Sequence, residues 1–309
     1  MGKESGGWRA SMGAVIRANN GRKANGSTAS FATQAKRKEE LTKAFETLRE
    51  KGYKLEDVKG FGGRHMDALA KEWGGQGLSA STLQNNVSVM RQFAEWIGKP
   101  GMIQSSAHYF GDAASRTSIS TEDKSWTQRG IDVDAKIAEV AAHDPRIGLQ
   151  LEGCKLFGLR VNEAAQLQPW ICDKGAYLEV VKGTKGGRPR TVPIVNEAQR
   201  QWIQRAKELT AADKKGSTSD PSLRLAEVKA HTYYVLRQCG ITRENGLTVH
   251  GLRHEYASDR YKDLTGADSP VRGGNLKSSD RSTDYAARVQ VSNELGHGRE
   301  GVTTHYLGR

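Results

Sequence analysis

The stretch 250–257, HGLRHEYA, carries the pattern on which the fold of this chain depends. As a helix, it places His250 and Arg253 three residues apart and therefore on one face. Leu252 and Tyr256 would then face the core. An H-x-x-R pair by itself is common and is typical of a helix surface, so the meaning of this pair depends on the clusters before and after it.

An arginine cluster lies upstream, in the stretch 158–163, GLRVNE. It follows an apolar run at 149–157 that is typical of a helix. Arg160 stands just before a further helical start, and Glu163 comes three residues later. An isolated arginine in such a position most often has a structural role.

A basic turn lies between these two clusters. Two β-rich runs, 176–181 (AYLEVV) and 190–195 (RTVPIV), flank the glycine-rich stretch 182–189 (KGTKGGRP). Short β-rich runs around such a turn predict a β hairpin. The turn is either a solvated basic loop or a loop that delivers a lysine, Lys182 or Lys185, to a phosphate group.

The last cluster is Leu295-Gly296-His297, followed nine residues later by Tyr306. No cluster is decisive alone, but their order is informative. In order along the chain come an arginine, a lysine hairpin, H-x-x-R, L-G-H and a tyrosine. This order resembles that of the tyrosine recombinase family, which includes phage integrases and chromosome-dimer resolvases. The motifs lie in 150–309, and residues 38–110 resemble the helical core-binding domain of that family.

The resemblance implies a mainly α fold with a small antiparallel β-sheet, in which a helical core-binding DNA domain and a catalytic domain close as a clamp around DNA. It also implies roles for individual residues. Arg160 and Arg253 would be the catalytic arginines, His250 and His297 the histidine-type positions, Tyr306 the nucleophile, and Glu163 the supporting acid.

The general-acid lysine follows from a family spacing. In the family, a lysine stands eight residues before the proline of the second strand, which selects Lys185 before Pro193. Lys182 is the alternative.

These residue types suit attack on a phosphodiester. Arginine stays charged, and its planar fork can hold two non-bridging oxygens of a phosphate. A phenol loses its proton more readily than an alkyl alcohol, so the departing 5′ oxygen needs a general acid, such as a lysine. The sequence contains no obvious set of carboxylate metal ligands, and we expect no metal, no other cofactor and no ATP requirement.

Composition points to an acidic partner. The 309 residues carry a formal net charge of +12, and the sequence pI is about 9.6. Such a surplus favours nucleic acid, although a merely basic enzyme is the alternative. The three cysteines form no CxxC pair, and neither a secretory leader nor an 18-residue apolar run is present. We therefore expect a cytoplasmic protein, associated with the nucleoid when bound to DNA, and no membrane partner.

Domain boundaries are predicted from composition and periodicity. Residues 1–37 predict a basic flexible segment, 38–110 a helical core-binding domain, 111–130 a linker, and 131–309 the catalytic domain. The polar stretch 264–285 predicts a loop inserted between helices. It accounts for the long interval of 44 residues between Arg253 and His297.

The expected function is site-specific DNA recombination or integration through a 3′-phosphotyrosyl intermediate, by an enzyme of a mobile genetic element. The resemblance implies a homotetramer on double-stranded DNA attachment sites, with DNA-bending or directionality factors as further partners. Only three residues follow Tyr306, which argues against the tail docking of many family members. A type IB topoisomerase-like enzyme and a non-catalytic DNA-binding protein on the same fold are the alternatives.

Overall fold

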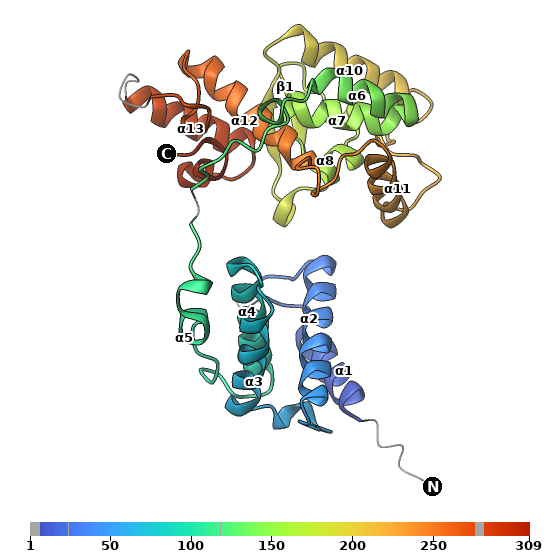
Figure 1. The fold of residues 1–309 in the computed structure, drawn as a ribbon. Helices are drawn as coiled ribbons and strands as arrows, with labels where there is room; N and C mark the ends of the chain where they lie inside the picture. Colours follow the sequence, from blue (N-terminus) through green and yellow to red (C-terminus); the bar gives the residue numbers. More distant parts are fainter. Residues whose placement is uncertain (1–6, 24, 118, 276–280) are drawn as a thin grey trace. The chain divides into compact units, whose positions relative to one another are not determined.

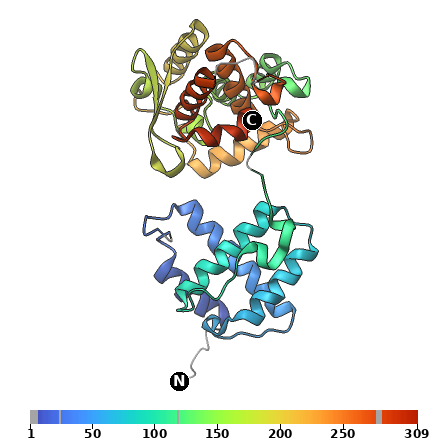
Figure 2. The same ribbon diagram turned by 90° about the vertical axis from the view of Figure 1, so that its left-hand side faces the viewer.

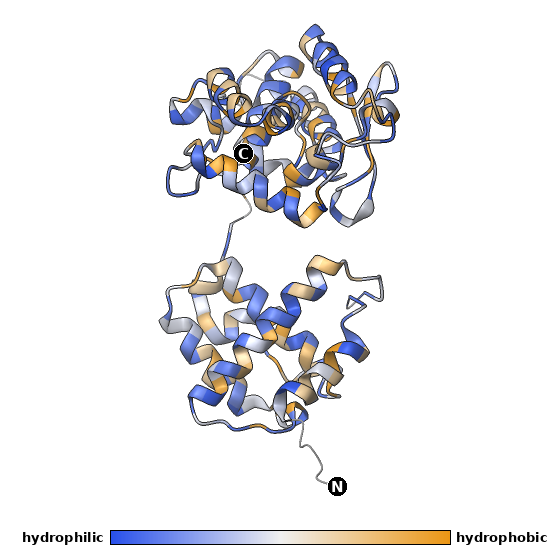
Figure 3. Cartoon of the chain, turned by 90° about the vertical axis from the view of Figure 1, so that its right-hand side faces the viewer, coloured by the Kyte–Doolittle hydropathy of each residue, from blue (hydrophilic) through white to orange (hydrophobic). Residues whose placement is uncertain are grey.

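The structure is a computed structural model that describes residues 7–23, 25–117, 119–275 and 281–309. The chain divides into two compact units, residues 1–117 and 118–309, each with its own hydrophobic core (Figure 1). Figure 3 shows hydrophobic and hydrophilic residues alternating along the helices, as amphipathic helices around a core require.

The N-terminal unit is built from helices. They are α1 (Trp8–Asn19), α2 (Phe31–Glu50), α3 (Gly63–Gly75), α4 (Ala80–Trp96) and α5 (Ser106–Phe110), with the 3-10 turns η1 (Val58–Gly60) and η2 (Gly111–Ala114). The rings of Phe45, Phe61 and Phe93 meet in its core at centroid distances of 5.4 to 5.9 Å. Helix α4 is capped by Ser79, whose side chain accepts a hydrogen bond from the backbone N–H of Thr82.

The prediction of a flexible segment at 1–37 is wrong for the residues described in it. Helix α1 buries Trp8, Met12 and Val15 in the core of the N-terminal unit, and Trp8 stacks on Phe45. Helix α2 begins at Phe31, before the predicted boundary at 38. The high content of Gly, Asn, Lys and Arg concealed an apolar stripe at i, i+4 and i+7, which is enough to dock one short helix.

The C-terminal unit is mainly α with one small antiparallel sheet, which confirms the predicted fold class. Its helices are α6 (Val133–His143), α7 (Pro145–Phe157), α8 (Val161–Gln166), α9 (Pro169–Cys172), α10 (Glu197–Leu209), α11 (Leu225–Gln238), α12 (Val249–Thr265), α13 (Arg281–Glu294) and α14 (Thr304–Leu307). Helix α7 packs against α6, α8, α10 and α12. Because α7 contacts four other helices, it forms the centre of this core.

The predicted hairpin is confirmed. Strand β1 (Tyr177–Val180) pairs antiparallel with β2 (Arg190–Pro193), in the register Tyr177 with Pro193 and Val180 with Arg190. Its loop is the yellow-green loop at the left edge of the C-terminal unit in Figure 2, and it contains the 3-10 turn η4 (Lys185–Gly187).

The linker prediction at 111–130 needs correction, because the boundary lies at 117 and 118. Trp126 is fully buried in the C-terminal core, and its indole N–H donates to the carbonyl of Thr248 at 2.8 Å. The N–H of Ser120 donates to the carbonyl of Thr304 at 2.9 Å. The loop-like composition concealed one large aromatic residue that anchors the segment. The turn η3 (Thr127–Arg129) follows it.

The predicted insert at 264–285 is partly helical. Helix α12 continues to Thr265, the turn η5 (Pro270–Arg272) follows, and α13 begins at Arg281, whereas 276–280 lie outside the described residues. The turn η6 (Glu300–Thr303) leads into α14. Within the described part of the chain, no helix combines the length and apolar character needed to span a bilayer.

Candidate active site

Four residues from distant parts of the sequence meet in the C-terminal unit. Arg160 precedes α8, Arg253 lies on α12, His297 follows α13, and Tyr306 lies on α14. Gly158 makes this meeting possible. It ends α7 with a positive φ of 56°, and a Cβ there would lie 2.6 Å from the Tyr256 ring.

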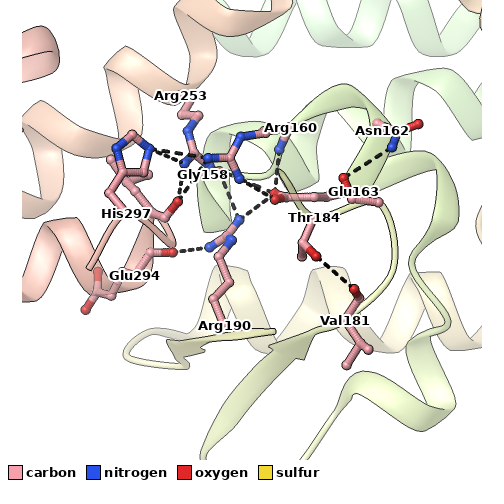
Figure 4. A network of polar contacts seen from close by, with 12 residues as sticks. Gly158, Arg160, Asn162, Glu163, Val181, Thr184, Arg190, Arg253, Glu294 and His297 are labelled. Carbon is pink, nitrogen blue, oxygen red and sulfur yellow. Dashed lines mark hydrogen bonds and ion pairs between the residues drawn. The ribbon is translucent and has the colours of Figure 1, made fainter. Parts of the chain in front are cut away.

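Arg253 is the centre of this group and is fully buried. Its guanidinium donates to the carbonyls of Gly158 and Leu295, to His297 Nε2 at 3.2 Å and to the hydroxyl of Tyr306 at 3.3 Å (Figure 4 shows the Gly158 and His297 contacts). Burial, followed by the charges of neighbouring arginines, lowers the pKa of Arg253 to about 10. The protein thus holds a buried cation in an environment that penalises its charge.

Arg160 is held beside Arg253 by Glu163. The fully buried carboxylate of Glu163 accepts from the Arg160 guanidinium at 2.5 Å and from the Arg160 backbone N–H at 2.8 Å. Burial alone would raise the pKa of Glu163, but Arg190 and Arg160 hold it below its usual range. Arg160 also donates to His297 Nε2 at 3.3 Å.

His297 lies between the two arginines and Tyr306. Its Nε2 accepts from both arginines and lies 3.5 Å from the hydroxyl oxygen of Tyr306. Burial, then the charges of Arg253 and Arg160, lowers the pKa of His297 to about 3. The ring is therefore neutral near pH 7, with its proton on Nδ1.

Two further histidines contact the Tyr306 ring. The ring centroids of His250 and His254 lie 5.7 and 4.8 Å from it. Burial, then the charges of Arg253 and Arg160, lowers the pKa of His250 to about 4, and the residue also lines the cavity described below. His254 was not among the predicted site residues, and the signal for it was its place on α12, one turn from His250.

The two candidate lysines lie on the hairpin loop and are exposed. The loop is pinned to α8 at Gly183, whose carbonyl accepts from the Asn162 side chain at 3.2 Å. Gly183 has φ 76°, and a Cβ there would lie 2.2 Å from the Asn162 carbonyl, so glycine is required. The loop therefore starts beside Arg160 and Glu163.

Arg190 is a site residue that the sequence reasoning missed. Its side chain, on β2, is 2% exposed and reaches the carboxylate of Glu163 at 2.8 Å. The alternation along β2 could have indicated it, because Arg190 stands two residues before the buried Val192 and so faces the same side.

A cavity of about 690 Å³ borders the group, and Arg160, His250, Tyr233 and Arg237 are among its lining residues. The cluster can therefore be reached from outside. Among the described residues, no group of three or more His, Cys, Asp or Glu is arranged to hold a metal ion.

Two family models match the chain. One, described as "Phage integrase, N-terminal", matches residues 18–103, and the other, described as "Integrase", matches residues 114–259. The chain belongs to the phage integrase family of tyrosine recombinases. It is a site-specific tyrosine recombinase. No curated protein sequence matches it.

Solved structures share the integrase fold at low sequence identity. A lambda integrase dimer bound to a COC′ core site matches with a TM-score of 0.62 and 16% identity, covering 96% of this chain and 94% of that one. The Tn1549 transposon integrase in complex with transposon right end DNA has a TM-score of 0.58 and 12% identity, covering 98% and 95%. A lambda integrase tetramer bound to a Holliday junction has a TM-score of 0.56 and 18% identity, covering 84% and 72%.

Proposed function

We propose that this integrase cleaves and rejoins double-stranded DNA through Tyr306, without metal or ATP. The phenolic oxygen of Tyr306 attacks the scissile phosphorus, the bond to the 5′ oxygen breaks, and a 3′-phosphotyrosyl link forms. A 5′ hydroxyl from another duplex reverses the step and exchanges the strands. The link conserves the bond energy, so rejoining needs no other energy source.

The proposal is carried by the position of the Tyr306 hydroxyl between a cation and a proton acceptor. Arg253 lies 3.3 Å away and would stabilise the phenolate as well as the non-bridging oxygens of the phosphate. Neutral His297, at 3.5 Å, would relay the phenolic proton to solvent, losing its own Nδ1 proton as it accepts at Nε2. Arg160, held by Glu163, supplies the second guanidinium at the phosphate.

Lys185 would protonate the leaving 5′ oxygen. After burial and the charges of Arg253 and Arg160, the charge of Lys185 also lowers the pKa of His297. This effect, together with the spacing from Pro193, supports Lys185 as the general acid, with Lys182 as the alternative. His250 would add a donor at the phosphate.

The partner and assembly follow from charge and from family members. A net charge of +12 suits a DNA ligand. Similar structures include integrases on core sites and a lambda integrase tetramer bound to a Holliday junction. We infer that this chain acts on attachment sites of a mobile element as a homotetramer, in the cytoplasm and at the nucleoid.

The test is covalent trapping on DNA. A pool of nicked duplexes with a randomised central sequence is incubated with the protein. Cleavage then releases a short fragment that carries the 5′ hydroxyl, so the covalent adduct cannot be rejoined. Adducts that survive denaturant are sequenced, which identifies the selected duplex. A recombinase enriches one sequence, a topoisomerase-like enzyme gives adducts without enrichment, and a binding protein gives none.

Tyr306→Phe should bind the selected duplex but form no adduct, because only the phenolic oxygen is lost. Tyr285→Phe, at an exposed tyrosine of α13, is the matched control and should react like the wild type. An adduct with the Tyr306→Phe variant would assign the nucleophile to another residue.

A further inference from the structure

Arg190 connects the lysine hairpin to both arginines of the site. It is the last paired residue of the hairpin, opposite Val180, and the loop with Lys182 and Lys185 closes at this pair. Its guanidinium points into the protein and contacts the end of α7, α8 and α13 (Figure 4).

The contacts of Arg190 are shared with Arg160 and Arg253. Arg190 donates to Glu163 at 2.8 Å, and the same carboxylate holds Arg160. It donates to the carbonyl of Gly158 at 3.1 Å, and Arg253 donates to the same carbonyl. A third contact goes to the carbonyl of Glu294, next to Leu295, whose carbonyl accepts from Arg253. A displacement of Arg190 would therefore disturb the supports of both arginines.

The charges in this cluster do not balance. The guanidinium groups of Arg160, Arg190 and Arg253 lie 2.5, 2.8 and 3.9 Å from the single carboxylate of Glu163. The carboxylate of Glu294 is already matched by Arg260 at 3.1 Å. The three arginines and the one carboxylate therefore leave a net charge of +2. The non-bridging oxygens carry two negative charges when phosphorus is five-coordinate, so the two charges match.

Stability alone does not account for this arrangement. The Nε–H of Arg190 is buried and has no hydrogen-bond partner in the described structure. An unpaired buried donor costs about 1–3 kcal/mol. Apolar side chains often replace buried ion pairs without loss of stability. Because Arg190 keeps its charge here despite an unpaired donor, we attribute to it a role in the reaction.

We propose that Arg190 is a positioning residue for strand cleavage, which holds Glu163 and the Gly158 carbonyl so that Arg160 and Arg253 present their charge to the phosphate. Arg190 itself is buried behind these two arginines and does not touch the DNA. This inference rests on the proposed function.

The test compares R190M and R190K with R205M. Arg205 is an exposed arginine on α10 that pairs with Glu152, and R205M is the matched control. The rate of adduct formation is measured at saturating selected duplex, and the half-saturating DNA concentration and the melting temperature are measured in parallel. If the wild type forms no adduct, the proposed function is refuted. If the wild type forms an adduct, the rates of the Arg190 variants test the role of Arg190 separately.

At saturating duplex, R190M should be slower by about 30-fold, because two preorganised charge contacts lose their support. The half-saturating concentration should change by less than about 3-fold, since the DNA contacts remain. R190K should be intermediate, because it keeps the charge but not the planar fork. A saturated rate for R190M within about 3-fold of the wild type, in folded protein, would refute the role.

A neutral substrate separates positioning from general support of the fold. A methylphosphonate at the scissile position carries one charge fewer on its non-bridging atoms, so it depends less on the arginines. The slowing caused by R190M should then shrink by about 3-fold or more relative to the phosphodiester. If R190M does not fold, the same ratio is measured with R190K. An equal slowing on both substrates would make Arg190 a structural residue only.

Discussion

Helix α12 joins two charge clusters of opposite composition. In the first, the arginine cluster, Arg160, Arg190 and Arg253 surround one carboxylate, Glu163. In the second, the carboxylate cluster, Asp123, Glu255 and Asp259 surround one arginine, Arg272, at 2.9, 2.9 and 2.6 Å. Arg253 and Glu255, only two residues apart, belong to different clusters.

The pKa of the central arginine moves in opposite directions in the two clusters. Burial lowers the pKa of Arg253 to about 10, and its arginine neighbours add to this effect. Burial would also lower the pKa of Arg272, but the hydrogen bonds and charges of Asp259 and Asp123 raise it. The arginine cluster therefore lacks an anion that a DNA phosphate can provide, whereas Arg272 already has its anions within the chain.

The carboxylate cluster has a structural task. It ties the turn η5 to α12 and to the segment around Asp123, where Glu255 also accepts from the backbone N–H of Thr127. That segment pairs with α14 through Ser120 and Thr304. The comparison thus predicts that losses in the arginine cluster slow the reaction and that losses in the carboxylate cluster destabilise the fold.

The largest effect is expected for Arg253→Ala and Arg160→Ala. Each should lower adduct formation at saturating duplex by about 10²-fold or more, because each removes a preorganised charge contact from the transition state. The measurement is single-turnover trapping on the selected duplex, with R205M as control. Wild-type rates in either variant would contradict the reactive role of the arginine cluster.

Lys185 extends the arginine cluster by an exposed cation. Lys185→Ala should slow adduct formation by about 50-fold on normal DNA, within the usual range for a lost general acid. On DNA with a 5′-bridging sulfur it should react nearly like the wild type, because a thiolate of pKa about 8.5 leaves without a proton. Arg160→Ala should show far less rescue. If Lys182→Ala is the rescued variant, the family spacing selected the wrong lysine.

Arg272→Met tests the other cluster. The free energy of unfolding should fall by about 2–3 kcal/mol, because three carboxylates lose their shared cation. The rate per folded molecule should stay within about 3-fold of the wild type. Urea unfolding and trapping, measured on the same preparation, distinguish the two quantities. A stable but slow Arg272→Met variant would mean that both clusters serve the reaction.

His254, between Arg253 and Glu255, should produce the smallest effect. Burial, then the charges of His250 and Lys124, lowers its pKa to about 3, so the unfolded chain binds a proton there that the folded chain does not. Through His254 alone, stability should fall as the pH drops from about 6.5, by about 1 kcal/mol per pH unit, and His250 and His297 add slopes of the same sign. His254→Asn should flatten this slope in urea unfolding between pH 7 and pH 5, whereas His143→Asn, at an exposed histidine of α6, is the control. A slope unchanged by His254→Asn would place its pKa near the usual value.

Local sequence patterns determined much of this protein. The sequence alone indicated the helices at 149–157 and 250–257, the hairpin with its glycine-rich turn, and the ordered motifs from Arg160 to Tyr306. They were readable because helix periodicity, capping and turn chemistry act over a few residues. The reactive roles of the motif residues remain predictions until the trapping experiments are done.

Only the tertiary structure decided which charges share a carboxylate. Arg190 and Glu163 are 27 residues apart, and Asp123 and Arg272 are 149 apart, so no local pattern pairs them. The same holds for α1 and Trp126, whose loop-like and basic surroundings concealed the apolar contacts that bury them. The pKa and the role of a charged side chain depend on burial and on the neighbours that folding brings to it. Arg253 has two arginines as neighbours, whereas Arg272 is surrounded by three carboxylates.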